Sequence, residues 1–150
     1  MSLVVADTTP INYLALCGTI DVLRPIYGQV VIPSAVFAEL NHQRTPSGVR
    51  AWVNALPEWV SVKTPVRPLT HPSLGLGERE AIALAKELNA VEVLIDERLA
   101  RDVAIQSGVA VTGTVAGFGV ALRLRDRPIS AKTSPATVRI RLGRGQEGVR

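Results

Sequence analysis

Short apolar runs alternate with longer amphipathic segments through most of this 150-residue chain. Runs of three or four mostly apolar residues are typical of strands that are buried on both faces of a sheet. Such runs occupy residues 3–6, 29–32, 93–95 and 109–112. Residues 59–63, with the sequence WVSVK, predict a further strand at the edge of the sheet.

The segments between these runs carry apolar side chains at helical spacing. Helices are predicted over residues 10–17, 34–41, 47–55, 78–89, 97–107 and 115–125. In the first helix we expect Thr8 or Thr9 to act as the N-cap and Pro10 to take the first helical position, where its missing N–H costs nothing. Gly18 and Gly108 are expected to end two of these helices.

Strands that alternate with helices predict an α/β fold in which a parallel sheet is flanked by helices on both faces. Right-handed crossovers then place the carboxyl ends of all the parallel strands along one edge. The chain length corresponds to a single domain. Hydrophobic residues make up 47% of the chain, which excludes an intrinsically disordered protein.

No targeting signal is expected in this sequence. The first apolar run stops at Asp7 and no basic segment precedes it, so a signal peptide is not expected. No stretch approaches the ~18 consecutive apolar residues of a membrane span. The single cysteine, Cys17, cannot form an internal disulfide, which fits a reducing compartment. We therefore expect a soluble, cytoplasmic protein without a membrane partner.

Acidic residues mark the ends of two predicted strands. Asp7 follows the first strand and Asp96 follows residues 93–95. Glu39 lies in the helix after the second strand, and Glu78 opens the helix before residues 93–95. Carboxylates in one crevice repel one another unless cations neutralise them or protons are retained. Because oxygen ligands select hard ions, the four acids predict a Mg²⁺ or Mn²⁺ site.

Each of these acids also has a purely structural interpretation. Asp7 and Asp96 are suitable N-caps, Glu39 is suitable for a solvated helix face, and Glu78 complements a helix dipole in the first turn. The functional interpretation needs all four to meet at one edge of the sheet. Thr8, Asn12 and Thr114 are expected to position water or phosphate from the same edge.

Four sequence blocks resemble the PIN-domain superfamily, and most closely its nucleic-acid-binding branch related to VapC-type toxins. They are VVADTTPINYLALCG, VIPSAVFAEL, LGLGEREAIALAKELNAVEVLIDERLAR and VAVTGTVAG, and the resemblance covers about residues 3–125. It implies a Mg²⁺- or Mn²⁺-dependent endoribonuclease that hydrolyses RNA phosphodiesters with a metal-activated water. It also implies a catalytic and metal-binding role for the four acids, Asp7, Glu39, Glu78 and Asp96.

The third acid has two registers in this resemblance. Glu78 matches the position, but Glu80 competes with it. Thr8 matches the hydroxyl that follows the first acid, and Asn12 matches a polar position one helical turn later. The resemblance further implies the toxin of a type II toxin–antitoxin pair, a homodimer, and a small antitoxin protein as partner.

Positive charge is concentrated at the C-terminal end. Residues 121–150 hold eight Lys or Arg against two acids, whereas the rest of the chain holds nine against eleven. We therefore divide the chain into a PIN-like domain, residues 1–128, and a basic extension, residues 129–150, which suits a polyanion or is merely solvated.

Two other functions remain open from the residues alone. One is a catalytically silent PIN-like module that binds nucleic acid or regulates. The other is a different doubly wound domain that binds a nucleotide or accepts a phosphoryl group. The second is disfavoured because no lysine ends the strand at residues 109–112.

Overall fold

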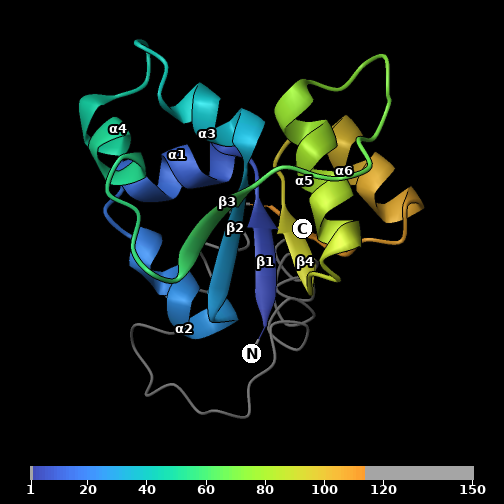
Figure 1. The fold of residues 1–150 in the computed structure, drawn as a ribbon, viewed down its shortest axis with the longest axis horizontal. Helices are drawn as coiled ribbons and strands as arrows, with labels where there is room; N and C mark the ends of the chain where they lie inside the picture. The colour runs from blue at the N-terminus through green and yellow to red at the C-terminus, as the bar shows by residue number, and fades with distance from the viewer. Residues whose placement is uncertain (1, 114–150) are drawn as a thin grey trace, which may run out of the picture.

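All five strands of the sheet run parallel, in the order β3-β2-β1-β4-β5, in the computed structural model, which describes residues 2–113 (Figure 1). Short apolar runs form these strands because parallel strands are covered on both faces. The strands are β1 (Leu3–Ala6), β2 (Gln29–Pro33), β3 (Val60–Lys63), β4 (Glu92–Leu94) and β5 (Val111–Thr112). The predicted α/β fold with a parallel sheet is confirmed.

The strand order reverses at β1. The chain adds β2 and β3 on one side of β1 and then returns to add β4 and β5 on the other side. In open α/β sheets, ligands bind outside the carboxyl ends of the strands at such a switch point. The Asp7 N–H donates to the Leu94 carbonyl oxygen at 3.0 Å, which fixes the end of β1 against β4. Asp7 and Asp96 therefore follow neighbouring strands at the same edge.

Helices cover both faces of the sheet. Figure 1 shows α1, α3 and α4 on one side of the strands and α5 and α6 on the other. The helical segments are α1 (Thr8–Leu16), the 3-10 turn η1 (Ile20–Val22), α2 (Leu23–Tyr27), α3 (Ser34–Leu40), α4 (Ser47–Val53), α5 (Leu76–Glu87) and α6 (Arg98–Gln106). Within residues 2–113, no helix is both long and apolar enough to cross a membrane.

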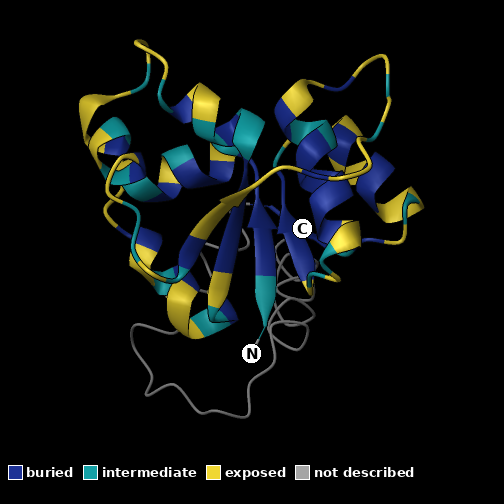
Figure 2. Cartoon of the chain, viewed as in Figure 1, coloured by how far each residue is buried: buried dark blue, intermediate teal, exposed yellow. Residues whose placement is uncertain are grey.

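Alternate residues of β1 enter two separate hydrophobic cores. Val4 and Ala6 pack with side chains of α1, α2, α3 and α4, whereas Val5 packs with side chains of α5 and α6. Figure 2 shows most of β1, β2 and β4 in the dark blue of buried residues. The side chains of Val4, Val5 and Ala6 are completely buried. Burial of apolar surface stabilises the folded state by roughly 25 cal/mol per Å². The two cores hold the central strands rigidly behind the edge that carries Asp7.

The structure corrects the expected start of the first helix. Neither Thr8 nor Thr9 is the N-cap: α1 begins at Thr8, Asp7 takes the cap position in extended backbone, and Pro10 is the third helical residue. The Thr8 hydroxyl is engaged elsewhere, as a donor to Glu39. Helix α5 likewise begins at Leu76, earlier than predicted, because Gly75 serves as its N-cap.

Other predicted boundaries agree with the structure to within one or two residues. Gly18 and Gly108 follow their helices with φ of +69° and +82°, a conformation that favours glycine. Strand β3 lies at one edge of the sheet, as predicted, and Val60 is its only buried residue. The helix predicted at residues 115–125, the domain boundary at residue 128 and the basic extension lie outside the described residues.

Candidate carboxylate site at the carboxyl edge of the sheet

Asp7 is the buried centre of the site. Its side chain is 6% exposed, and its pKa is raised from 3.8 to about 7. Burial is the largest cause, because it penalises the charged form. The negative charges of Glu78, Glu39 and Asp96 raise the pKa further, against an opposing effect of the Thr8 backbone. The other three predicted acids therefore all lie within electrostatic reach of Asp7.

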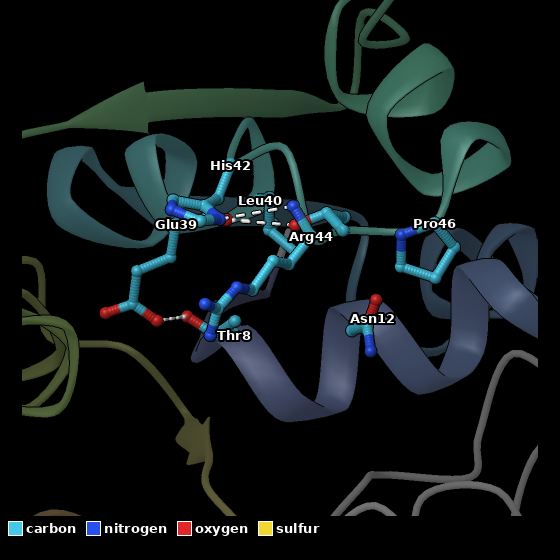
Figure 3. Close-up of a pocket in the computed structure, with 8 residues that line it drawn as sticks. Thr8, Asn12, Glu39, Leu40, His42, Arg44 and Pro46 are labelled. Carbon is cyan, nitrogen blue, oxygen red and sulfur yellow. Dashed lines mark hydrogen bonds between the residues drawn. The ribbon is translucent and has the colours of Figure 1, made fainter.

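Glu39 is held toward Asp7 by α1. The Thr8 hydroxyl donates a hydrogen bond to Glu39 Oε2 at 2.6 Å, as Figure 3 shows. Glu39 lies near the end of α3, so this bond connects the first turn of α1 to the helix that follows β2. A threonine directly after the first acid thus orients a second acid, while its predicted role of positioning water or phosphate stays a prediction.

The first turn of α5 lies directly against both carboxylates. A Cβ atom added at Gly77 would lie 3.0 Å from Glu39 Oε1 and 3.4 Å from Asp7 Oδ1. It would also lie 3.2 Å from a methyl carbon of Val36. Even a methyl group at this position would require the Glu39 carboxylate and the Val36 side chain to shift by a few tenths of an ångström. Gly77 was not among the site residues predicted from the sequence, although its place between Leu76 and Glu78 at a helix start was visible there.

Glu78 is the acid of α5 that couples to the others. Its pKa is raised by burial first, and then by the charges of Glu97 and Glu39, while the backbone of Gly75 acts in the opposite direction. Glu97 itself is exposed and caps α6, where its carboxylate accepts the Ala100 N–H at 2.8 Å.

Glu80, the competing register for the third acid, serves a different part of the fold. It is 8% exposed, and its Oε1 accepts the Ser34 hydroxyl at 2.8 Å and the Ala35 N–H at 2.9 Å. These are the first residues of α3, whose leading N–H groups lack partners inside the helix. Glu80 therefore joins α5 to the start of α3, and the geometry favours Glu78 over Glu80 as the acid that acts on Asp7.

Asp96 lies beyond the end of β4 beside the last described residues. A Cβ atom at Gly113 would lie 3.3 Å from Asp96 Oδ1 and 3.6 Å from Arg101 Nη1. The Asp96 carboxylate and the Arg101 guanidinium are thus both close to the buried Gly113. Thr114, predicted to support the site, is outside the described residues.

The donor chemistry of this cluster suits a hard divalent cation, since all four side chains offer carboxylate oxygens. Within residues 2–113, however, no group of three or more His, Cys, Asp or Glu side chains is arranged to hold a metal ion. Mutual repulsion keeps like charges apart. The residues fit a hard divalent ion in chemistry, and the described carboxylates would have to lie closer together to coordinate one.

A cleft opens next to the cluster, between α1 and the loop that follows α3. Its volume is about 340 Å³ (Figure 3). The lining residues are Thr8, Asn12, Glu39, Leu40, His42, Arg44, Thr45 and Pro46. Thr8 and Glu39 belong to both the cluster and the cleft. Asn12, predicted to support the site, lies in this cleft, and its Oδ1 is buried without a hydrogen-bond partner.

Two similarities connect the chain to known proteins. A family model described as a PIN domain matches residues 3–135. The solved structure of a PilT N-terminus domain protein from the hyperthermophilic archaeon Sulfolobus solfataricus P2 is similar with a TM-score of 0.57 at 18% sequence identity. That similarity covers 81% of this chain and 94% of the archaeal chain, and at this identity it shows the fold alone. No curated protein matches the chain.

Proposed function

Since the chain belongs to the PIN-domain family, as the sequence blocks indicated, we propose that it is a Mg²⁺- or Mn²⁺-dependent endoribonuclease. PIN domains are generally nucleases. The observation that carries the proposal is the buried Asp7 at the switch point of the sheet, with its pKa raised in part by three further acids. A buried carboxyl group beside other acids destabilises the fold. Carboxyl groups with strongly shifted pKa values are concentrated at functional sites.

The acids of the cluster share one role in this proposal, and their neighbours Thr8 and Gly77 have others. Asp7, Glu39, Glu78 and Asp96 would hold the ion. A divalent ion there would polarise a phosphoryl oxygen and lower the pKa of a water molecule. The Thr8 hydroxyl orients the Glu39 carboxylate. Gly77 leaves the space in which Glu39 and Asp7 approach α5. No side chain is needed as a nucleophile.

The ionisation of Asp7 limits this chemistry at low pH. With a pKa of about 7, Asp7 is mostly protonated at about pH 6, and a protonated carboxyl is a poor ligand for a hard cation. Activity at limiting metal is therefore expected to rise as the pH increases through about 7. A saturating metal concentration shifts this rise to lower pH, because the ion competes with the proton.

The biological setting is proposed from the resemblance. We infer a toxin of a type II toxin–antitoxin pair that acts on RNA in the cytoplasm, forms a homodimer and is silenced by a small antitoxin protein. The eight Lys and Arg side chains of residues 121–150 support a polyanionic partner. Co-expression with the product of a neighbouring gene, followed by purification of a stable complex, tests the antitoxin.

A cleavage assay tests the nuclease. Wild type and Asp7→Asn are incubated with mixed structured and single-stranded RNA in Mg²⁺, Mn²⁺ or EDTA. Asp21→Asn is the matched control, because Asp21 is exposed in η1 and lies beyond the far end of α1 from Asp7. Cleavage that requires metal, is lost in Asp7→Asn and persists in Asp21→Asn supports the proposal. Equal cleavage by all three proteins points to a contaminating ribonuclease.

A second candidate function is a catalytically silent module that binds nucleic acid. The observation in its favour is that, in the part of the chain the structure describes, the acids are not arranged to hold a metal ion. Salt-dependent RNA binding without cleavage at any Mn²⁺ concentration would favour this candidate.

A further inference from the structure

The cleft beside the carboxylates supports an inference that rests on the proposed function and extends it. We propose that this cleft binds the nucleotide adjacent to the cleaved phosphodiester of single-stranded RNA, with Arg44 on its phosphate. The cleft volume of about 340 Å³ lies at the lower end of the range for small-molecule sites, which suits one nucleotide.

The position of the cleft favours this role. Thr8 and Glu39 line the cleft and also belong to the carboxylate cluster, so the two sites are continuous. A strand whose reacting phosphate lies over the carboxylates must pass one of its neighbouring nucleotides through the space between α1 and the loop after α3. In Figure 3 the Arg44 side chain extends from that loop toward the Thr8 end of the cleft.

The charge of the residues that line the cleft also favours the binding of a nucleotide there. The carboxylate cluster repels a phosphodiester backbone, and Arg44 supplies a permanent positive charge in the lining of the cleft. A guanidinium group can donate two parallel hydrogen bonds to one phosphate, a geometry that lysine lacks. Arg44 is exposed, so it can reach a ligand without a change in the domain core.

The loop that carries Arg44 is pre-organised. The His42 N–H donates to the Glu39 carbonyl oxygen at 3.1 Å, and the Thr45 hydroxyl donates to the same oxygen at 3.1 Å. The Arg44 N–H donates to His42 Nδ1 at 3.2 Å. These hydrogen bonds hold the loop in one conformation. The loop therefore loses less conformational entropy when a ligand binds.

Binding, measured apart from cleavage, tests this inference. The full chain carrying Asp7→Asn is titrated with fluorescein-labelled oligoadenylate, oligocytidylate and oligouridylate over a series of salt concentrations, and RNA integrity is checked on a gel. Arg44→Ala is then added to this background. Arg24→Ala is the matched control, because Arg24 is exposed on α2, which lies at the amino edge of the sheet.

The expected result is about tenfold weaker binding of all three RNAs by Arg44→Ala. The slope of log K against log salt is expected to fall by ~0.7, the value for one lost phosphate contact on a single strand. Arg24→Ala is expected to bind like its parent.

Two results would overturn the inference. They are equal affinities of the Arg44→Ala and Arg24→Ala proteins, and failure of the parent to bind any of the three RNAs. The nuclease proposal fails separately: wild type that binds RNA through Arg44 but never cleaves it contradicts the nuclease and leaves the nucleotide site standing.

Discussion

Replacing Asp7 with Asn is expected to stabilise the metal-free domain while it removes activity. The folded protein raises the pKa of Asp7 from 3.8 to about 7, so the folded state disfavours the charged carboxylate relative to the unfolded chain. This rise of the Asp7 pKa from 3.8 to about 7 corresponds to about 4 kcal/mol of folding free energy at about pH 8, where the carboxyl group is mostly ionised in both states. Asparagine lacks this charge and recovers that free energy.

The sign of the pH dependence follows from the same shift. Between pH 3.8 and about 7 the folded state binds more protons than the unfolded state, so the stability of wild type falls as the pH rises through this range. The advantage of Asp7→Asn is therefore expected to grow from near zero at about pH 3 to about 2 kcal/mol at about pH 5 and about 4 kcal/mol at about pH 8.

Urea unfolding in EDTA at about pH 5 and about pH 8, followed by far-ultraviolet circular dichroism, measures this difference. Asp21→Asn is the control, and its exposed side chain predicts a change within about 0.5 kcal/mol at either pH. If Asp7→Asn is less stable than wild type at the higher pH, the carboxyl is not penalised by burial and the reasoning from its raised pKa is refuted.

Three further changes test the supporting structure. Gly77→Ala is expected to reduce cleavage roughly tenfold or more, because its Cβ would contact Glu39 Oε1, while Gly75→Ala, whose Cβ would meet nothing within 4 Å, is expected to remain active in the same assay. Glu80→Ala is expected to lower the free energy of unfolding by about 2 kcal/mol in urea, because two donors at the start of α3 lose their acceptor, with no loss of Mn²⁺ affinity. Glu78→Gln is expected to show the reverse, with reduced Mn²⁺ affinity and unchanged or higher stability. If titration calorimetry instead shows that Glu80→Ala loses Mn²⁺ affinity and Glu78→Gln keeps it, Glu80 is the third ligand.

The order of strands and helices could be predicted from the sequence because parallel strands leave a simple pattern. Residues 29–32 and 93–95 are mostly apolar on both faces, and a strand of that kind must be covered on both sides. The strand order then brings Asp7 and Asp96 to one edge, as the alternation of elements indicated. The predicted cap of α1 was wrong because the hydroxyl of Thr8 found a distant partner, Glu39, that no local rule could supply.

The residues that shape the site could not be predicted because they act through tertiary contacts. The role of Gly77 depends on the approach of α5 to α3, and glycine is common near helix starts for reasons of local backbone geometry alone. Glu80 and Glu78 are equivalent in sequence pattern, and only the position of α3 separates them. The role of Glu92 could not be predicted either. Glu92 is 4% exposed in β4 and accepts hydrogen bonds from the Tyr27 and Thr112 hydroxyls. A single acid within a strand does not indicate such a buried network.

The central claim is that the carboxylates around Asp7 form a divalent metal site, and titration calorimetry with Mn²⁺ tests it most directly. Measured at about pH 6 in two buffers of different ionisation enthalpy, wild type is expected to release about 0.9 proton per ion bound, because a carboxyl of pKa about 7 must ionise to coordinate. At about pH 8 the release is expected to fall to about 0.1 proton. Asp7→Asn is expected to lose most of the affinity and all of the proton release. Mn²⁺ binding of equal affinity by wild type and Asp7→Asn, or no binding by wild type at millimolar Mn²⁺, would contradict the claim.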